Sequence, residues 1–198
     1  MDNTKKPGNP TTLGTYSVVK GDATSPENVE NNIVIPHVCN DQGGWGSGFV
    51  LAINRRYGYL PRAMYLNWKE KQCCSIPMRV YESGEFALGE VQMVIVKDFD
   101  GCPSDKPKKC FIANMIGQHL TGEDEHGNAP IRYAALVNAM DKVTSYIHKM
   151  WEGGLGAEIV CPKFGSGLAG GDWNFIEVLI KEIWCGAGIN VTVCEYED

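Results

Sequence analysis

Two glycine-rich segments hold the residues whose types and spacing best suit chemistry. The first covers residues 39–48 (CNDQGGWGSG) and the second covers residues 164–171 (FGSGLAGG). Glycine lets the backbone approach an anion closely, and the N-terminus of a following helix adds free N–H groups and a positive dipole end. Two such segments at one edge of a sheet suit a diphosphate and the sugar beyond it. For either segment alone, the competing interpretation is a structural turn.

The second segment contains a G-x-G-x-x-G pattern made by Gly165, Gly167 and Gly170. This spacing is the dinucleotide-binding fingerprint when it follows a strand and opens a helix. Too few residues follow Gly170 to supply the remaining strands of a dinucleotide fold, and the Lys-Ser/Thr end of a P-loop is missing. We therefore expect a phosphate-binding loop here and not an NAD site.

The elements that must position these segments alternate between β-type runs and helical patterns. Strands are expected at residues 16–20, 32–38, 90–97, 109–115, 157–161 and 189–195. Helices are expected at residues 131–149, 48–57 and 61–71, and another is expected behind Asp172 as N-cap, with Phe175 among its inward residues. Residues 101–109 are expected to form a solvated turn. This alternation predicts a mostly parallel sheet with helices on both faces, whose ligands bind beyond the carboxyl ends of the strands.

Composition points to one globular domain with a small-molecule ligand. The chain has 198 residues, 43% of them hydrophobic, and a formal net charge of −6. We expect a flexible tail at residues 1–14 and one domain at residues 15–198. A net negative charge disfavours broad binding to nucleic-acid phosphates, although a local basic patch stays possible. No apolar run approaches the roughly 20 residues of a membrane span.

The eight cysteines suggest free thiols and not a metal site. None forms a C-x-x-C pair, and no cysteine–histidine cluster has zinc spacing. The first residues are polar and lack the apolar stretch of a signal peptide. We therefore expect a cytoplasmic protein without membrane association, metal ion or cofactor.

Residues 20–24 (KGDAT), after the first expected strand, resemble the G-D-[IA]-T motif of the macrodomain (Appr-1-p processing) family. In that family the aspartate accepts a hydrogen bond from the adenine amino group of ADP-ribose. The resemblance assigns this role to Asp22, with Gly21 and Ala23 beside it. A turn-forming aspartate is the competing interpretation of this motif.

Two longer stretches are similar to the branch of that family that removes the phosphate of ADP-ribose 1″-phosphate. Residues 37–48 (HVCNDQGGWGSG), continuing to Arg56 and Tyr57, match its first loop, and residues 161–173 (CPKFGSGLAGGDW) match its second. The resemblance covers roughly residues 16–196. It implies a three-layer α/β/α macrodomain with a mixed, mostly parallel central sheet.

The resemblance also assigns the site residues. It implies catalytic roles for His37 and, in the loop of residues 117–130, for Asp124. A histidine that titrates near neutral pH could orient or protonate the leaving group at the distal phosphate. His119 and His126 share the loop with Asp124, so histidine catalysis could also be located there. The ligand-binding residues it implies are Gly21, Asp22, Ala23, Val38, Cys39, Asn40, Trp45, Gly46, Ser47, Gly48, Phe49, Val50, Gly165, Ser166, Gly167, Leu168, Ala169, Gly170 and Gly171.

Two other functions remain open at this point. An ADP-ribosyl hydrolase would release ADP-ribose from modified protein or nucleic acid, with Asp41 or His119 as base. Some members of that related branch use a lysine after the fourth strand, and residues 114–118 (NMIGQ) contain none. A non-catalytic module would bind ADP-ribose only. Nucleic acid is expected as a partner only in ADP-ribosylated form.

Overall fold

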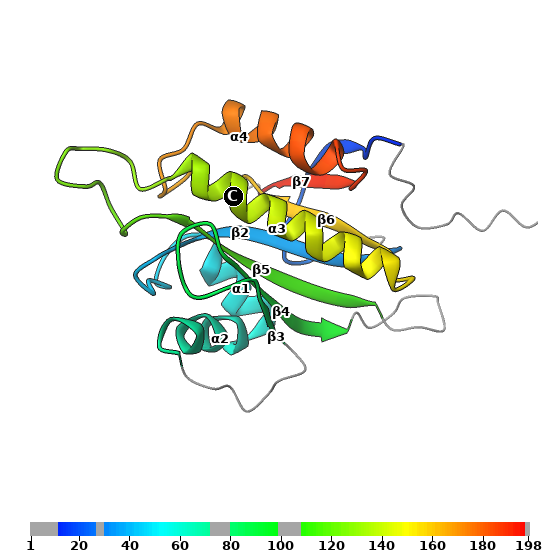
Figure 1. Ribbon diagram of the computed structural model, residues 1–198, viewed down its shortest axis with the longest axis horizontal. Coiled ribbons are helices and arrows are strands. Elements are labelled where there is room, and N and C mark those ends of the chain that lie inside the picture. Colours follow the sequence, from blue (N-terminus) through cyan, green and yellow to red (C-terminus); the bar gives the residue numbers. More distant parts are fainter. Residues whose placement is uncertain (1–11, 27–29, 72–79, 99–107, 197–198) are drawn as a thin grey trace, which may run out of the picture.

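The computed structural model describes residues 12–26, 30–71, 80–98 and 108–196 (Figure 1). Residues 101–107 of the expected turn and residues 1–11 of the expected tail lie outside these ranges. The strands are β1 (Tyr16–Lys20), β2 (Asn32–Asn40), β3 (Val80–Glu82), β4 (Val91–Asp98), β5 (Lys109–Gln118), β6 (Ala157–Pro162) and β7 (Val191–Glu195). The helices are α1 (Phe49–Tyr57), α2 (Leu60–Lys69), α3 (Tyr133–Glu152) and α4 (Trp173–Leu179), which continues as the π-helical segment η1 (Ile180–Cys185).

The strands form one mixed sheet in the order β1-β7-β6-β2-β5-β4-β3. The pairs from β1 to β5 are parallel, and β4 and β3 add antiparallel strands at one side. The mixed, mostly parallel sheet expected from the sequence is confirmed. The carboxyl ends of β1, β7, β6, β2 and β5 therefore meet at one edge.

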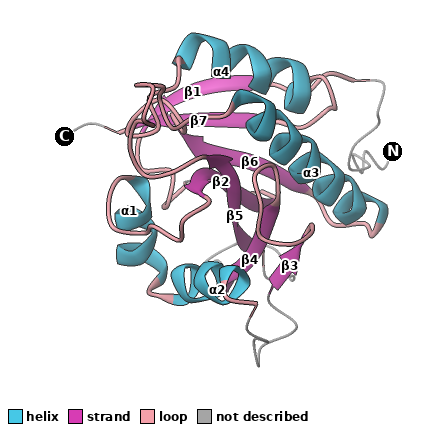
Figure 2. Ribbon diagram, turned by 60° about the vertical axis from the view of Figure 1, so that its left-hand side comes forward, coloured by secondary structure: helices cyan, strands magenta, loops and turns pink. Residues whose placement is uncertain are grey.

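Helices cover both faces of this sheet, as Figure 2 shows. Helices α3 and α4 pack with η1 on one face, and α1 and α2 pack on the other. Successive strand residues alternate between the two cores: Val34 packs toward α3, whereas Ile33 and Ile35 pack toward α1. This alternation follows from the two-residue period of a strand, and it explains why the central strands carry apolar residues on both faces over most of their length. The three-layer α/β/α architecture is confirmed.

Several element boundaries differ from those expected. The three-residue strand β3 was not expected, because so short a stretch with exposed residues carries no clear pattern. Strand β2 continues to Asn40 and β5 to Gln118, so both extend further toward the glycine segments. Helix α3 begins at Tyr133, because Ile131 instead forms an isolated bridge with Gln118.

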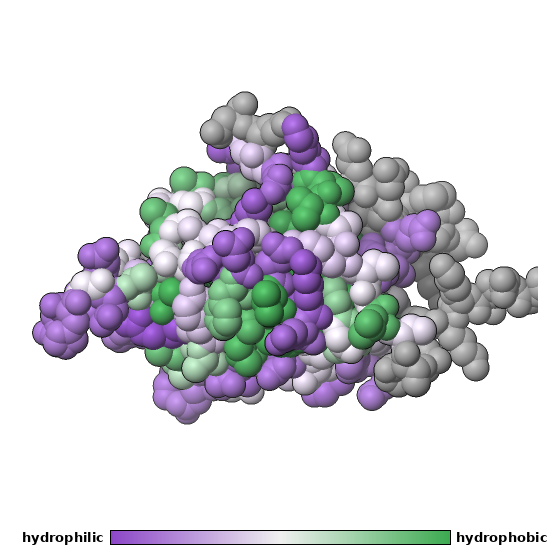
Figure 3. Space-filling view, turned by 90° about the horizontal axis from the view of Figure 1, so that it is seen from above, coloured by the Kyte–Doolittle hydropathy of each residue, from purple (hydrophilic) through white to green (hydrophobic). Residues whose placement is uncertain are grey.

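One residue of the fourth helix faces the other way. Phe175, expected to point inward, is 45% exposed, because Ile176 and Leu179 occupy the buried side of α4. Figure 3 views the molecule from the α4 side and shows apolar side chains gathered in patches between polar ones. In the part of the chain that is described, no helix is both long and apolar enough to cross a bilayer.

Candidate functional site

A cavity of about 310 Å³ opens at the carboxyl edge of the parallel strands. Its size lies at the lower end of the range for small-molecule sites in proteins, about 300–1,000 Å³. Both glycine segments contribute to its walls, as the sequence pattern predicts. The lining residues are His37, Val38, Cys39, Asn40, Gly44, Gly46, Ser47, Gly48, Phe49, Val50, Gln118, Thr121, Pro162, Lys163, Phe164, Gly165, Gly167, Leu168 and Ala169.

Asn40 shapes the first glycine segment from within. Its Oδ1 accepts hydrogen bonds from the backbone N–H groups of Gln42 (3.0 Å) and Gly44 (2.8 Å), and its Nδ2 donates to the Gly44 carbonyl (2.9 Å). Tyr65 of α2 donates its hydroxyl hydrogen to the Asn40 carbonyl oxygen. Trp45 does not line the cavity; it is buried and donates from Nε1 to Asn54 of α1 (3.1 Å). The segment is therefore fixed to both helices that follow it.

The second glycine segment divides into residues that shape the loop and residues that leave space. Gly165 and Gly170 have φ angles of 76° and 69°, a left-handed conformation that other residues rarely adopt. At Gly171, an added Cβ would lie 2.6 Å from the Gly165 carbonyl oxygen. Gly167 differs, because a Cβ there would meet nothing within 4 Å and the residue lines the cavity. A side chain at Gly167 would occupy cavity space.

Helix α4 begins directly behind this segment. The carboxylate of Asp172 accepts a hydrogen bond from the backbone N–H of Asn174 at 2.9 Å, which confirms Asp172 as the N-cap. The Asp172 backbone N–H donates to the Tyr133 hydroxyl at 2.7 Å. These contacts tie the loop to both helices on one face of the sheet.

His37 lines the cavity but lies inside β2 and is only 2% exposed. Its Nε2 is 2.7 Å from Oδ1 of Asn114, and the ring of Trp45 stands edge-on at 5.4 Å. Burial lowers the pKa of His37 to about 4, against the opposing effect of the Asn114 hydrogen bond. The expected titration near neutral pH is therefore wrong: at pH 7 this imidazole is neutral and is a poor proton donor.

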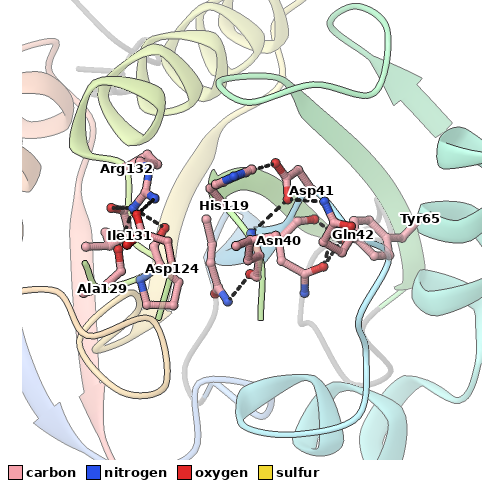
Figure 4. Close-up of polar contacts among 12 residues, drawn as sticks. Asn40, Asp41, Gln42, Tyr65, His119, Asp124, Ala129, Ile131 and Arg132 are labelled. Atoms are coloured by element: carbon pink, nitrogen blue, oxygen red, sulfur yellow. Dashed lines mark hydrogen bonds and ion pairs between the residues drawn. The ribbon is translucent and has the colours of Figure 1, made fainter. Parts of the chain in front are cut away.

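A second histidine is paired with a carboxylate where the loops after β2 and β5 meet (Figure 4). His119 Nδ1 lies 2.6 Å from Oδ2 of Asp41, whose Oδ1 accepts from the Leu120 backbone N–H and from Gln42. Partial burial acts to raise the pKa of Asp41, but these hydrogen bonds, led by that from His119, lower it below its usual value. Because the carboxylate can only accept, Nδ1 of His119 carries the hydrogen and Nε2 is left as the basic atom. Neither residue lines the cavity, but their neighbours Asn40 and Gln118 do.

Asp124, expected as a catalytic residue, holds its own loop together instead (Figure 4). Its Oδ1 accepts from the backbone N–H groups of His126 and Asn128, and its Oδ2 accepts from the Asn128 side chain and from Arg132 (3.3 Å). The hydrogen bonds from Asn128 are the main cause of a lowered Asp124 pKa. Asp124 does not line the cavity, so the structure does not bring it to the glycine segments.

Asp22 lies at the same sheet edge, beyond the cavity wall. Its Oδ1 accepts from both the backbone N–H and the hydroxyl of Thr24, each at 2.8 Å, which is the turn geometry named as the competing interpretation. The neighbouring Gly21 N–H donates to the carbonyl of Glu195 at the end of β7. Gly21, Asp22 and Ala23 do not line the cavity, and nor do Ser166, Gly170 and Gly171.

Solved structures with the same fold decide the family. A macrodomain protein from Streptomyces coelicolor is 37% identical with a TM-score of 0.67, and the match covers 92% of this chain and 100% of that one. The chain belongs to the macrodomain family. A Bacteroides thetaiotaomicron protein of unknown function is 36% identical with a TM-score of 0.72, covering 91% of this chain and 98% of that one. Thermosipho africanus DarTG, solved in complex with ADP-ribose, shares the fold at 13% identity with a TM-score of 0.60. That match covers 95% of this chain and 44% of the Thermosipho chain. No protein-family model matches, and no curated protein matches.

Three polar residues of this macrodomain's cavity were missed by reasoning from the sequence: Gln118, Thr121 and Lys163. Gln118 ends β5, and Lys163 directly follows β6, so both occupy the strand ends where ligands of α/β sheets bind. Extending that rule from glycine to polar residues would have found them. Lys163 forms an ion pair with Glu195 at 2.6 Å, and its ammonium stands 5.8 Å from the ring of Trp173.

Proposed function

We propose that this macrodomain binds ADP-ribose, with the diphosphate between the two glycine segments and the distal ribose toward His37. The observation that carries the proposal is the cavity itself, which joins both segments at the carboxyl edge of the sheet. The ADP-ribose complex of the Thermosipho structure supports this ligand. Asp22 would reach the adenine through its Oδ2, since its Oδ1 is engaged by Thr24.

The charges around the cavity fit a diphosphate held mainly by backbone groups. Among the described residues that line it, Lys163 is the only charged one at neutral pH, and it is shared with Glu195. Backbone N–H groups of glycine-rich loops bind phosphate oxygens without side-chain charge, because the peptide dipoles converge on the anion. Binding is then expected to depend more on loop geometry than on ionic strength.

The reaction proposed is hydrolysis of the phosphate ester of ADP-ribose 1″-phosphate. His119, oriented by Asp41 and next in the chain to the cavity residue Gln118, would supply the base: its Nε2 would take the proton of the attacking water. The water oxygen adds to phosphorus, the bond to the ribose oxygen breaks, and that oxygen is protonated by solvent. This arrangement follows the general logic of a histidine oriented by a carboxylate. His37 acts as a wall of the ribose site and not as an acid.

Removal of ADP-ribose from modified protein or nucleic acid is the second candidate function. It uses the same ligand site and differs in the group that leaves from C1″. The observation that favours it is the exposure of the pair: the His119 side chain is 42% exposed, so a large substituent could extend past it into solvent. The lysine that some members of that branch carry at the end of this strand is replaced here, because Gln118 lines the cavity at the end of β5.

Incubation with three substrates tests these functions. ADP-ribose 1″-phosphate, ADP-ribosylated protein and ADP-ribosylated DNA are each mixed with the protein, and free phosphate and free ADP-ribose are measured. We expect phosphate release from ADP-ribose 1″-phosphate. Release of ADP-ribose from protein or DNA, without phosphate release from ADP-ribose 1″-phosphate, would favour the second candidate function over the phosphatase. Absence of both products would leave a binding module.

His119→Ala tests the proposed base. We expect turnover to fall about 10²–10⁴-fold, the usual contribution of a general base, with ADP-ribose affinity nearly unchanged. His126→Ala is the matched control, because His126 is an exposed histidine of the same loop whose side chain lies 3.6 Å from the exposed Glu125. Equal turnover of the two variants would remove His119 from the mechanism.

A further inference from the structure

Four polar side chains form a continuous hydrogen-bonded ladder across the sheet beneath the cavity. They are Glu82 on β3, Gln92 on β4, Asn114 on β5 and His37 on β2, and each is the direct cross-strand partner of the next. Gln92 and Asn114 are fully buried. Gln92 Nε2 lies 2.8 Å from Glu82 Oε1, Asn114 Nδ2 lies 3.1 Å from Gln92 Oε1, and His37 Nε2 lies 2.7 Å from Asn114 Oδ1.

A backbone carbonyl fixes the direction of every hydrogen bond in this polar ladder. Gln92 contacts the carbonyl oxygen of Met64 in α2 at 2.9 Å, and a carbonyl oxygen can only accept. The amide group of Gln92 at that contact must therefore be NH₂, so its Oε1 faces Asn114. Asn114 must then donate its own NH₂ to Gln92 and turn its Oδ1 toward His37. The network thus assigns amide orientations that atomic positions alone do not distinguish.

The orientation of the Asn114 amide fixes the tautomer of His37. Because Asn114 Oδ1 can only accept, His37 Nε2 must carry the hydrogen. A neutral imidazole has one donor and one acceptor, and burial keeps this imidazole neutral at pH 7, with a pKa of about 4. The remaining ring atom, Nδ1, is therefore an acceptor. The Cys39 thiol, a weak donor, lies beside the ring at 3.7 Å from Nδ1 and 3.8 Å from Nε2, so a better donor could take the lone pair of Nδ1.

Stability alone does not account for such a ladder. Replacing both partners of a buried hydrogen bond by apolar groups of the same shape is often neutral or stabilising. The ladder occupies the α1–α2 face of the sheet, where the neighbouring buried residues Ile35 and Ile112 are apolar. Of the four ladder residues, His37 is the one that lines the cavity. A role at the cavity explains why these buried positions are polar, which packing alone does not.

We propose that the polar ladder is a positioning device that holds His37 as the neutral, Nε2-protonated tautomer, so that Nδ1 accepts a hydrogen bond from a sugar hydroxyl of the ligand. A phosphate dianion has no hydrogen to donate, and its oxygens would face a lone pair. His37 thus selects a hydroxyl-bearing group at this end of the cavity. Gln92 and Asn114 act through His37. The identification of that group as the distal ribose rests on the proposed function.

Nitrogen-15 NMR of the free protein tests the ladder without any ligand. With labelled histidine, His37 should show a protonated Nε2 and an unprotonated Nδ1 at pH 7, its signals being assigned by their loss in His37→Gln. Gln92→Leu should release the Asn114 amide and produce a second population protonated at Nδ1. Glu82→Ala is the control, because the Met64 carbonyl still orients Gln92 and the tautomer should not change.

Two outcomes would overturn the ladder. One is a wild-type His37 that is protonated at Nδ1 or charged at pH 7, and this result does not depend on whether Gln92→Leu folds. Another is a folded Gln92→Leu variant with an unchanged, single tautomer.

Addition of ligand separates the ladder's role from the proposed function. ADP-ribose should shift the Nδ1 resonance toward that of a hydrogen-bonded acceptor, and inorganic phosphate should not. If calorimetry shows ADP-ribose bound while Nδ1 stays unchanged, the role of His37 in selecting the ligand is wrong and the ligand stands. If calorimetry shows no binding while the predicted tautomer is present, the proposed function is wrong and the tautomer assignment stands.

Discussion

At the scale of single residues, burial decides what His37 can do. A histidine before a glycine-rich loop suggests an acid or base, but the type of residue does not reveal its protonation. Here the side chain is buried against Trp45 and against Phe49, the first residue of α1, where loss of water disfavours the charged form. The exposed His119, held by Asp41, keeps the contact with solvent that a proton carrier needs.

The neutral state of His37 predicts how stability depends on pH. The folded pKa is about 4, whereas an unfolded histidine titrates near 6.5, so between these values the unfolded chain binds a proton that the folded chain does not. Stability should therefore be lost as the pH falls from about 6.5 to 4, by at most about 3 kcal/mol from this residue.

His37→Gln isolates this contribution. The glutamine amide can still donate to Asn114 but does not titrate, so the variant should lose less stability over the same window. Urea denaturation of both proteins at several pH values between 7 and 4 measures the difference. Parallel curves would show that His37 is charged in the folded protein or exposed to water.

At the scale of elements, the glycine loops depend on the helices behind them. The second segment enters α4, whose first turn is capped by Asp172. Asp172→Ala should lower the free energy of unfolding by about 1 kcal/mol, the usual value of an N-cap side chain. Asp172→Asn should retain most of that stability, because its amide oxygen also accepts from Asn174. Thermal or urea unfolding of the three proteins checks this; equal losses in both variants would assign the effect to charge instead.

The sequence predicted the elements with strong periodicity and missed those set by distant contacts. The central strands and α3 follow apolar patterns that result from burial in the cores, so their type was predictable. Strand β3 is three residues long, and only its pairing with β4 defines it. Both glycine segments were located from residue type and order. The pairing of Asp41 with His119 joins loops 78 positions apart, and nothing in the local sequence of either reveals it.

At the scale of the whole molecule, the parallel sheet brings distant segments to one edge. The segment after β1, the segment after β2 and the segment after β6 are far apart in the chain, but the order β1-β7-β6-β2-β5 places their strand ends in one row. Asp22, both glycine segments and the end of β5 lie along that row. The central claim is that one ligand, ADP-ribose, uses this row.

Calorimetric titration tests that claim most directly. Wild-type protein is titrated with ADP-ribose and with AMP, and Gly167→Val is titrated with ADP-ribose. Gly122→Val serves as control, because a Cβ at Gly122 also meets nothing within 4 Å but the residue does not line the cavity. The account predicts much tighter binding of ADP-ribose than of AMP, loss of binding in Gly167→Val, and melting temperatures close to wild type in both variants. Equal affinity for the two nucleotides, or unchanged binding by folded Gly167→Val, would contradict it.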